Sequence, residues 1–383
     1  MIARDEEEML PGCLASVAGF VDEVIVVDTG SRDATIRLAR EAGAKVVEQP
    51  WMDDFAAPRN RGLQEATGDW VLVLDADERL TPDACKALRR AVEIGGFDCG
   101  MLPLHNATRT DAALEAVVSG KLRLGEVAYL PRLLRRTPDL EYQGIIHESV
   151  GQWLLRGERE AKFLKGLDIV HLGGAPDIRQ RKEKSKRNIA LLERYRERSP
   201  DDITPYGYLA HEYLEAGQPE KAREVADAGW ARLDTGRALI DLSVLRLTTA
   251  RAWMLVQKAE AAESLATLER GMEMVPDHPD IHFIRGCALE MRGLMAEERH
   301  TRQAELEAAL VAYQAARDKD DTLLLQKFVQ GCTSWAAEVR LGTCAMLLGR
   351  HGEATEHFDR AVDQKADCVE AQWGRIECLL ATG

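Results

Sequence analysis

The stretch TGDWVLVLDADERL, residues 67–80, carries an apolar run straight into a cluster of carboxylates. Four aliphatic residues in a row, Val71–Leu74, are followed directly by Asp75, and then by Asp77 and Glu78. A short unbroken apolar run of this kind predicts a strand that is buried on both faces. We therefore expect a strand that delivers Asp75 and Asp77 to a ligand cleft, with Glu78 as an acid leading into a helix that begins at Pro82.

The residues before this strand alternate between helical and strand patterns. Helical spacing is found over residues 5–20, 34–43 and 59–68, and apolar strand patterns over residues 24–28, 45–47 and 70–75. This order predicts an α/β domain in which helices cover a parallel sheet. Asp28 and Asp75 would then both end strands of one sheet, at the edge where open α/β sheets bind their ligands.

The composition narrows the class of protein. A net charge of −14 and a pI near 5.3 leave no overall basic field, so we expect no nucleic-acid partner. Eight cysteines without a C-x-x-C pair indicate core residues in a reducing compartment. No signal-peptide pattern opens the chain, and no run approaches the roughly 18 apolar residues of a membrane span. We expect a cytoplasmic protein, either free or peripheral at the inner membrane face.

The D-x-D pair formed by Asp75 and Asp77 suits a hard divalent cation. Two carboxylates one residue apart at a strand end can share Mg²⁺ or Mn²⁺, or one can hold the cation while the other takes a sugar hydroxyl. Such a cation keeps waters and phosphate oxygens as its remaining ligands, which suits a diphosphate substrate. The alternative is an ordinary solvated turn, because turns share this composition.

The runs MIARDEEEMLPGCLASV, VDEVIVVDTGSRDAT, APRN and LDADE occur in this order, and together they resemble a family 2 glycosyltransferase of the GT-A fold. More narrowly, they resemble the bacterial branch with tetratricopeptide repeats behind the catalytic domain. The resemblance is nearly continuous over residues 1–80 and looser to about residue 175. It implies a Rossmann-like, mostly parallel GT-A domain over residues 1–175. It also implies metal-dependent, inverting transfer of a sugar from a nucleoside diphosphate sugar, with UDP as the expected nucleotide and Mn²⁺ or Mg²⁺ as the cofactor.

The resemblance also implies roles for single residues. Asp28 would contact the nucleotide base or ribose. Asp75 would face the ribose and the metal, and Asp77 would hold the metal on the diphosphate. Arg59 and Asn60 match a pair near the nucleotide pocket. From the residues alone, Asp28 can equally be a turn-capping acid, and Arg59 a surface cation.

A second group of candidates lies downstream, in QGIIHESV and LDIVHLGG. Inverting transfer needs a base close to the attacking nucleophile, and Glu148 is the candidate for that role, with Asp77 acting on the leaving group. His171 would complete the metal shell, as a late histidine does in some GT-A enzymes, and Arg132 would steady phosphate. The alternatives are a hydrogen-bonded structural histidine at a strand end and an arginine that simply decorates a strand.

The second half of the chain has the composition of a helical array. Small and apolar residues recur at the spacing of a 34-residue tetratricopeptide repeat, at Leu209, Tyr213, Gly217 and Ala222, and again at Leu341, Gly342, Gly349, Ala354, Phe358 and Ala361. We therefore expect a repeat domain over residues 201–383, joined to the first domain by a basic helix over residues 176–200. Such an array offers a surface for a protein or peptide partner, or for self-association.

Two other functions compete with a glycosyltransferase. One is a non-catalytic scaffold, whose repeats bind a protein partner beside a degenerate transferase domain; intact Asp28, Asp75 and Asp77 argue against it. The other is a nucleotidyltransferase, which should show a Gly-rich basic loop near the N-terminus, and MIARDEEEM has none. The sequence leaves the acceptor open between a glycan, a lipid-linked glycan and a protein side chain.

Overall fold

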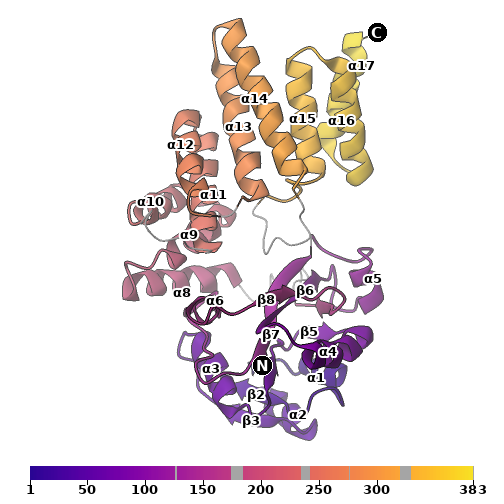
Figure 1. Ribbon diagram of the computed structural model, residues 1–383, viewed down its shortest axis with the longest axis vertical. Coiled ribbons are helices and arrows are strands. Elements are labelled where there is room, and N and C mark those ends of the chain that lie inside the picture. Colours follow the sequence, from indigo (N-terminus) through magenta and orange to yellow (C-terminus); the bar gives the residue numbers. More distant parts are fainter. Residues whose placement is uncertain (126, 174–183, 234–241, 276, 320–328, 383) are drawn as a thin grey trace. The chain divides into compact units, whose positions relative to one another are not determined.

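The computed structural model describes residues 1–125, 127–173, 184–233, 242–275, 277–319 and 329–382 (Figure 1). The chain divides into two compact units, Met1–Tyr195 and Arg196–Gly383. Of the predicted basic helix over residues 176–200, the described part forms α8 (Lys184–Arg198), and residues 174–183 lie outside the described residues. The domain limits expected from the sequence, residues 1–175 and 201–383, stay predictions.

A parallel three-stranded sheet begins the first unit. Its strands, in the order β1-β2-β3, are β1 (Ile2–Ala3), β2 (Ile25–Asp28) and β3 (Lys45–Glu48). The connecting helices are α1 (Leu10–Val17) and α2 (Thr35–Glu41). Leu10 and Leu14 of α1 pack with Val26 of β2 and Ala39 of α2 in one small core.

A second, mixed sheet carries most of the candidate site. Its strand order is β4-β7-β6-β9-β5, and β8 also pairs with β6. The strands are β4 (Trp70–Leu72), β5 (Glu78–Leu80), β6 (Cys99–Asn106), β7 (Ala128–Arg135), β8 (Ala161–Phe163) and β9 (Ile169–His171). The helices of this region are α3 (Ala56–Glu65), α4 (Pro82–Ile94), α5 (Leu114–Val118) and α6 (Gly151–Arg156). The hydroxyl of Thr81 accepts from the N–H of Ala84, so α4 begins where the sequence predicts.

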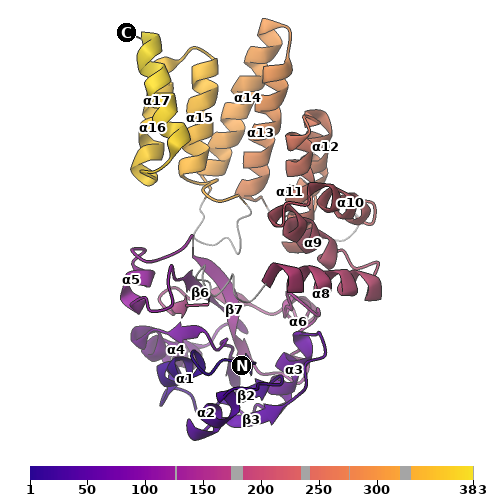
Figure 2. The same cartoon turned by 180° about the vertical axis from the view of Figure 1, so that it is seen from behind.

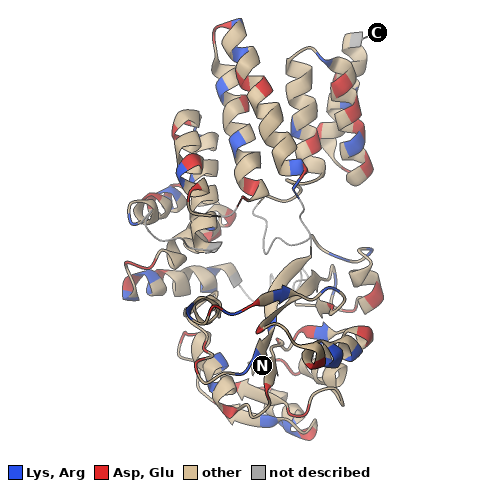
Figure 3. Cartoon of the chain, viewed as in Figure 1, with Lys and Arg blue, Asp and Glu red and all other residues tan. Residues whose placement is uncertain are grey.

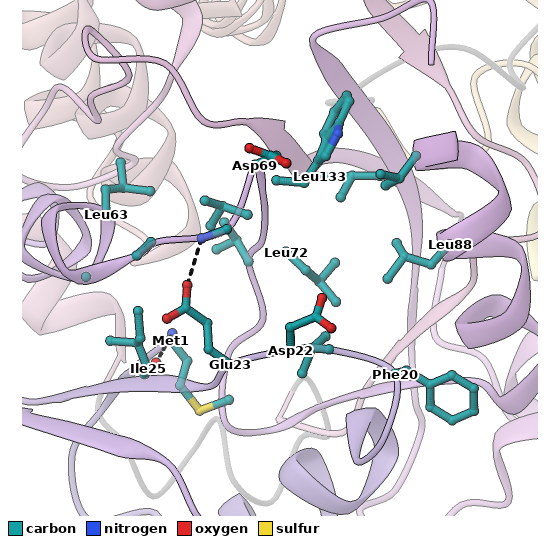
Figure 4. Close-up of a pocket in the computed structure, with 18 of the residues that line it drawn as sticks. Met1, Phe20, Asp22, Glu23, Ile25, Leu63, Asp69, Leu72, Leu88 and Leu133 are labelled. Carbon is teal, nitrogen blue, oxygen red and sulfur yellow. Dashed lines mark hydrogen bonds between the residues drawn. The ribbon is translucent and has the colours of Figure 1, made fainter. Parts of the chain in front are cut away.

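Asp28 and Asp75 do not end strands of one hydrogen-bonded sheet, and that expectation is wrong. Strand β4 pairs with β7 in the second sheet, whereas β2 lies between β1 and β3 in the first. A largely apolar cavity of about 340 Å³ separates the two sheets; residues 70–73 line it, and so do Met1 and Ile2 of the two-residue β1 (Figure 4). Among the described residues, β1 pairs with β2, and its sheet does not include β4.

The second unit is built of helices that pack in sequence order (Figures 1 and 2). Its helices are α9 (Thr204–Glu215), α10 (Pro219–Trp230), α11 (Leu242–Gln257), α12 (Ala261–Met272), α13 (Pro279–Met295), α14 (Arg299–Arg317), α15 (Trp335–Leu347), α16 (His351–Gln364) and α17 (Val369–Thr382). Leu341, Ala354 and Phe358 are fully or almost fully buried, as the repeat spacing predicts. The predicted fold class, an α/β domain followed by an all-α repeat unit, is confirmed.

The distribution of charged side chains and the burial of the cysteines agree with what the composition predicts. Lys and Arg are interspersed with Asp and Glu along the helices of the second unit (Figure 3). All eight cysteines are buried and free, as expected for small core residues. Among the described residues, none of the helices combines the length and the apolar character needed to cross a bilayer.

Candidate functional site

Asp75 lies just beyond β4, between two guanidinium groups. Arg59 Nη2 donates to Asp75 Oδ1 at 3.0 Å, and Arg132 Nη2 donates to Oδ2 at 3.1 Å. The side chains of Arg59 and Arg132 are only 12% and 10% exposed. Burial by itself would raise the pKa of Asp75, but the two guanidinium charges hold this pKa well below its usual range. Both oxygens of the first acid of the D-x-D pair therefore face cations of the chain itself.

Arg59 also reaches the candidate base. Its Nε donates to Glu148 Oε1 at 2.5 Å, across 89 positions of sequence, and its guanidinium lies over the ring of Tyr142. Its Nη1 is buried without a hydrogen-bond partner in the part of the chain that the structure describes. His147, just before Glu148, has a φ of +54°, in the left-handed region that non-glycine residues rarely adopt. The HE pair is thus held in a constrained conformation beside Arg59.

Glu78 is not the helix-approach acid that the sequence suggested. It is the first residue of strand β5 and is 1% exposed. Its Oε2 accepts from the N–H of Asp75 at 2.9 Å, and its Oε1 accepts from Arg132 Nη2. Burial, together with the nearby charge of Asp75, raises the pKa of Glu78 to about 7, although Arg132 opposes the shift. The expectation failed because a strand, β5, forms between the D-x-D pair and α4.

Asp77 and His171 face each other across neighbouring strands. Strand β5 pairs with β9, and the N–H of Leu172 donates to the carbonyl oxygen of Asp77 at 2.9 Å. Asp77 Oδ2 lies 3.4 Å from His171 Nε2, while His171 Nδ1 lies 2.7 Å from Asn106 Oδ1. An amide oxygen only accepts, so this contact favours a proton on Nδ1 and a lone pair on Nε2 in the neutral imidazole. A Cβ at Gly173 would lie 1.7 Å from Asp77 Oδ2, so glycine is needed for this close approach.

The facing pair fits a cation that is shared with a substrate. A carboxylate oxygen suits Mn²⁺ or Mg²⁺, and a neutral imidazole nitrogen is a common metal ligand. Among the described residues, however, no group of three or more His, Cys, Asp and Glu side chains could hold a metal ion. Mg²⁺ and its relatives are commonly held by one or two protein groups together with phosphate oxygens and waters. The residues present therefore fit a diphosphate-bound cation, and they do not fit an all-protein metal cage.

Two other predicted residues are engaged with nearby backbone. Asp28 is 2% exposed, and its Oδ1 accepts from the N–H groups of Gly30 and Ser31 at 2.9 Å each. The Ser31 hydroxyl donates to the other oxygen, which is the turn-capping arrangement weighed as the alternative. Asn60 Nδ2 donates to the carbonyl of Tyr142 at 2.9 Å, and the N–H of Tyr142 donates to Asn60 Oδ1 at 2.7 Å.

The structure thus brings six of the eight predicted residues into two adjoining groups. Arg59, Asp75, Arg132 and Glu148 form one, and Asp77 and His171 form the other. Asp28 and Asn60 belong to neither group through any described contact. Their roles, like those of the other six, stay predictions.

Three contributing residues were missed from the sequence. They are Glu78, Asn106 and Tyr142. Asn106 ends the long apolar strand β6, so the strand-end argument used for Asp75 would have found it. Tyr142 lies outside the described helices and strands, and no local pattern marks it.

The cavity of Figure 4 is distinct from these carboxylates. Arg59 and Tyr142 are among its lining residues, but Asp75, Asp77 and Glu148 are not. Leu63, Leu72 and Leu88 are among its apolar lining, which suits packing better than a nucleotide. We therefore place the candidate site at Asp77 and His171.

Comparison with known proteins assigns the first part of the chain to a family model. Residues 1–147 match the family model of glycosyl transferase family 2. A TPR repeat-containing protein of Synechococcus elongatus is 39% identical over 209 residues, which cover 53% of this chain and 48% of that protein. The SPbeta prophage-derived glycosyltransferase SunS of Bacillus subtilis is 22% identical over 305 residues, which cover 76% of this chain and 65% of SunS.

Solved structures resemble the helical part. The TPR protein YrrB, described as having an unusual peptide-binding site, is 16% identical with a TM-score of 0.36, over 52% of this chain and 87% of YrrB.

The matches to the two curated relatives span only about half to two thirds of those proteins. The stretch that matches the glycosyl transferase family 2 model, residues 1–147, holds all the predicted site residues except Glu148 and His171.

Proposed function

We propose that this chain is a metal-dependent glycosyltransferase that moves a sugar from a nucleoside diphosphate sugar, with UDP as the expected nucleotide, to a hydroxyl or other nucleophile. The observation that carries the proposal is the facing pair of Asp77 Oδ2 and His171 Nε2, 3.4 Å apart, beside the charged cluster around Asp75. Mn²⁺ or Mg²⁺ held there would neutralise the leaving diphosphate. Inversion of configuration is part of the proposal and comes from the family resemblance.

In this proposal Asp77 and His171 would hold the cation, and the positive charge of Arg132, which pairs with Asp75 and Glu78, would favour the diphosphate. The acceptor oxygen or sulfur attacks the anomeric carbon of the donor while the bond from that carbon to the diphosphate oxygen breaks. The acceptor's proton passes to Glu148. Because Arg59 holds Oε1 of Glu148, the other oxygen, Oε2, is the one proposed to take the proton.

Asp28, Asn60 and Asp75 have a different part in the proposal. Asp28 and Asn60 would shape the nucleotide pocket indirectly, by fixing the backbone at Gly30 and Tyr142. Asp75 would face the ribose once donor binding competes with its two arginine partners. A structure with UDP and Mn²⁺ bound would check each of these contacts.

Each of the two units is expected to bind partners of its own kind. The acceptor is a glycan, a lipid-linked glycan or a protein side chain, and the repeat unit would bind a protein, a peptide or a second copy of the chain. The expected location is the cytoplasm, free or at the inner membrane face. The paired helices with their recurring spacing support the partner proposal because arrays of this architecture commonly bind proteins or peptides.

The test is thermal unfolding with a panel of nucleoside diphosphates and their sugars, with and without Mn²⁺. A ligand that binds only the folded state stabilises it by about 2.7 kcal/mol at a concentration of 100 times Kd. We expect a Mn²⁺-dependent rise in Tm with one nucleotide, lost in Asp77→Ala. The control is Asp83→Ala, because the Asp83 side chain is 97% exposed and lies on α4, away from the pair. If no member of the panel raises the Tm of the wild-type protein, the proposed function is wrong.

A further inference from the structure

Glu78 forms two hydrogen bonds that close the D-x-D turn. Its own N–H donates to the carbonyl oxygen of Asp75 at 3.0 Å, and its Oε2 accepts from the N–H of Asp75 at 2.9 Å. Glu78 is 1% exposed, so these bonds are shielded from water. A buried turn with both ends hydrogen-bonded in this way has little freedom to change shape.

The second oxygen of the same carboxylate ties the turn to strand β7 of the same sheet. Oε1 accepts from Nη2 of Arg132, which lies on β7 and also donates to Asp75 Oδ2 at 3.1 Å. Glu78 therefore holds Asp75 directly through its backbone and indirectly through Arg132. Bonds that involve charged groups are the stronger ones, particularly where water is excluded.

The D-x-D turn also determines the position of Asp77. Glu78 is the register partner of His171 in the β5–β9 pair, and the N–H of Leu172 donates to the carbonyl oxygen of Asp77. Any movement of the backbone at Asp75 or Glu78 therefore changes the 3.4 Å approach of Asp77 to His171.

We propose that Glu78 is a positioning residue for the D-x-D motif, which holds the turn and Arg132 so that Asp77 meets His171. It is too buried to touch the donor, so it acts through these neighbours. The proposal rests on the proposed function, because it is the cation site of Asp77 and His171 that Glu78 would position.

The test is the Glu78→Gln variant, with binding of UDP plus Mn²⁺ measured by calorimetry on folded protein. The amide oxygen of glutamine can serve either the N–H of Asp75 or Arg132, and its NH₂ group would face the other donor. We expect Kd to rise about tenfold or more, in the range found when residues that orient metal ligands are changed. If Glu78→Gln does not fold, Glu78→Asp is measured instead; it keeps the charge but is too short to reach both partners, and the same rise in Kd is expected.

Glu290→Gln is a matched control in the other unit. Glu290 is 6% exposed, accepts from the hydroxyl of Tyr313 at 2.6 Å and pairs with Arg340 at 3.4 Å, so the chemical change is the same. We expect Glu290→Gln to lower thermal stability and leave Kd for UDP plus Mn²⁺ unchanged. A purely structural role for Glu78 would give it the same result as this control, and that would overturn the proposal.

A double variant adds a second readout. If Glu78 acts partly through Arg132, Glu78→Gln combined with Arg132→Gln weakens binding by less than the product of the two single effects. Strictly multiplicative effects would contradict this route. If the wild type itself fails to bind any nucleotide of the panel with Mn²⁺, the proposed function fails and the positioning role fails with it. If the wild type binds and Glu78→Gln binds equally well, only the positioning role fails.

Discussion

At the scale of single residues, the buried charges beyond β4 compensate each other. Two guanidinium groups, of Arg59 and Arg132, face the carboxylates of Asp75, Glu78 and Glu148. The pKa of Asp75 is held low, whereas that of Glu78 rises to about 7, so adjacent acids of one motif differ in the ease with which they lose a proton. Buried ion pairs add little net stability, but removing one partner leaves an uncompensated charge that is costly. The cluster therefore constrains geometry more than it contributes to the free energy of folding.

Asp28 is a predicted site residue whose described contacts are structural, so its substitution should change the stability of the fold. Asp28→Ala should lower the free energy of unfolding by about 1–3 kcal/mol, because two backbone N–H groups and the Ser31 hydroxyl lose their acceptor. Urea unfolding followed by circular dichroism measures this change. The control is Asp22→Ala, since Asp22 is 92% exposed and pairs only at the surface with Arg89, and a change within about 0.5 kcal/mol is expected. Unchanged stability with lost UDP binding in Asp28→Ala would instead assign Asp28 a direct nucleotide contact.

At the scale of elements, small residues set how closely the repeat helices approach. A Cβ on Gly342 of α15 would lie 2.8 Å from a ring atom of Phe358 of α16, and one on Gly374 of α17 would lie 2.4 Å from the same ring. Phe358, 1% exposed, thus packs between two glycines on either side of α16. The spacing of these residues in the sequence reflects that packing.

Two glycine substitutions in these helices should have opposite effects. Gly342→Ala overpacks against Phe358 and should lower the stability of the repeat unit by about 1–3 kcal/mol. Gly352→Ala, on α16 with no atom within 4 Å of the added Cβ, should raise stability by up to about 1 kcal/mol through helix propensity. Thermal unfolding of both variants checks the pair. Equal shifts in the same direction would mean that contact with Phe358 does not limit the approach of α15 and α16.

At the scale of the whole molecule, each unit has a core of its own. In the first unit Leu74, Leu80, Leu133 and Ile169 pack in one cluster that joins several strands. In the second, Phe358 packs with residues of α15, α16 and α17. Units with separate cores can unfold independently, in which case a single Tm does not describe the chain.

Calorimetry of the full chain should therefore show two transitions. UDP with Mn²⁺ should move only the transition of Met1–Tyr195, because the candidate site belongs to that unit. Gly342→Ala should move only the other transition. One transition that responds to both changes would show that the two units unfold as a single cooperative body.

Local features of the fold were predictable from the sequence because neighbouring residues create them. The strand ahead of Asp75, the cap and first residue of α4, and the buried repeat positions around Leu341 all depend on contacts within one element or between adjacent elements. The presence of candidate acids at strand ends follows from the same local patterns.

The tertiary structure alone decided which of those residues meet. Arg59 and Glu148 are 89 positions apart, and Asn106 and His171 are 65 apart, so their contacts depend on strand register and on α3 packing, which leave no local signature. The burial of Glu78 likewise depends on β5 pairing with β9, and the division into two sheets depends on which strands pair across long stretches of sequence. The sequence by itself determined the elements and the charged residues at their ends, whereas long-range pairing determined which charges compensate each other and left Asp77 facing His171.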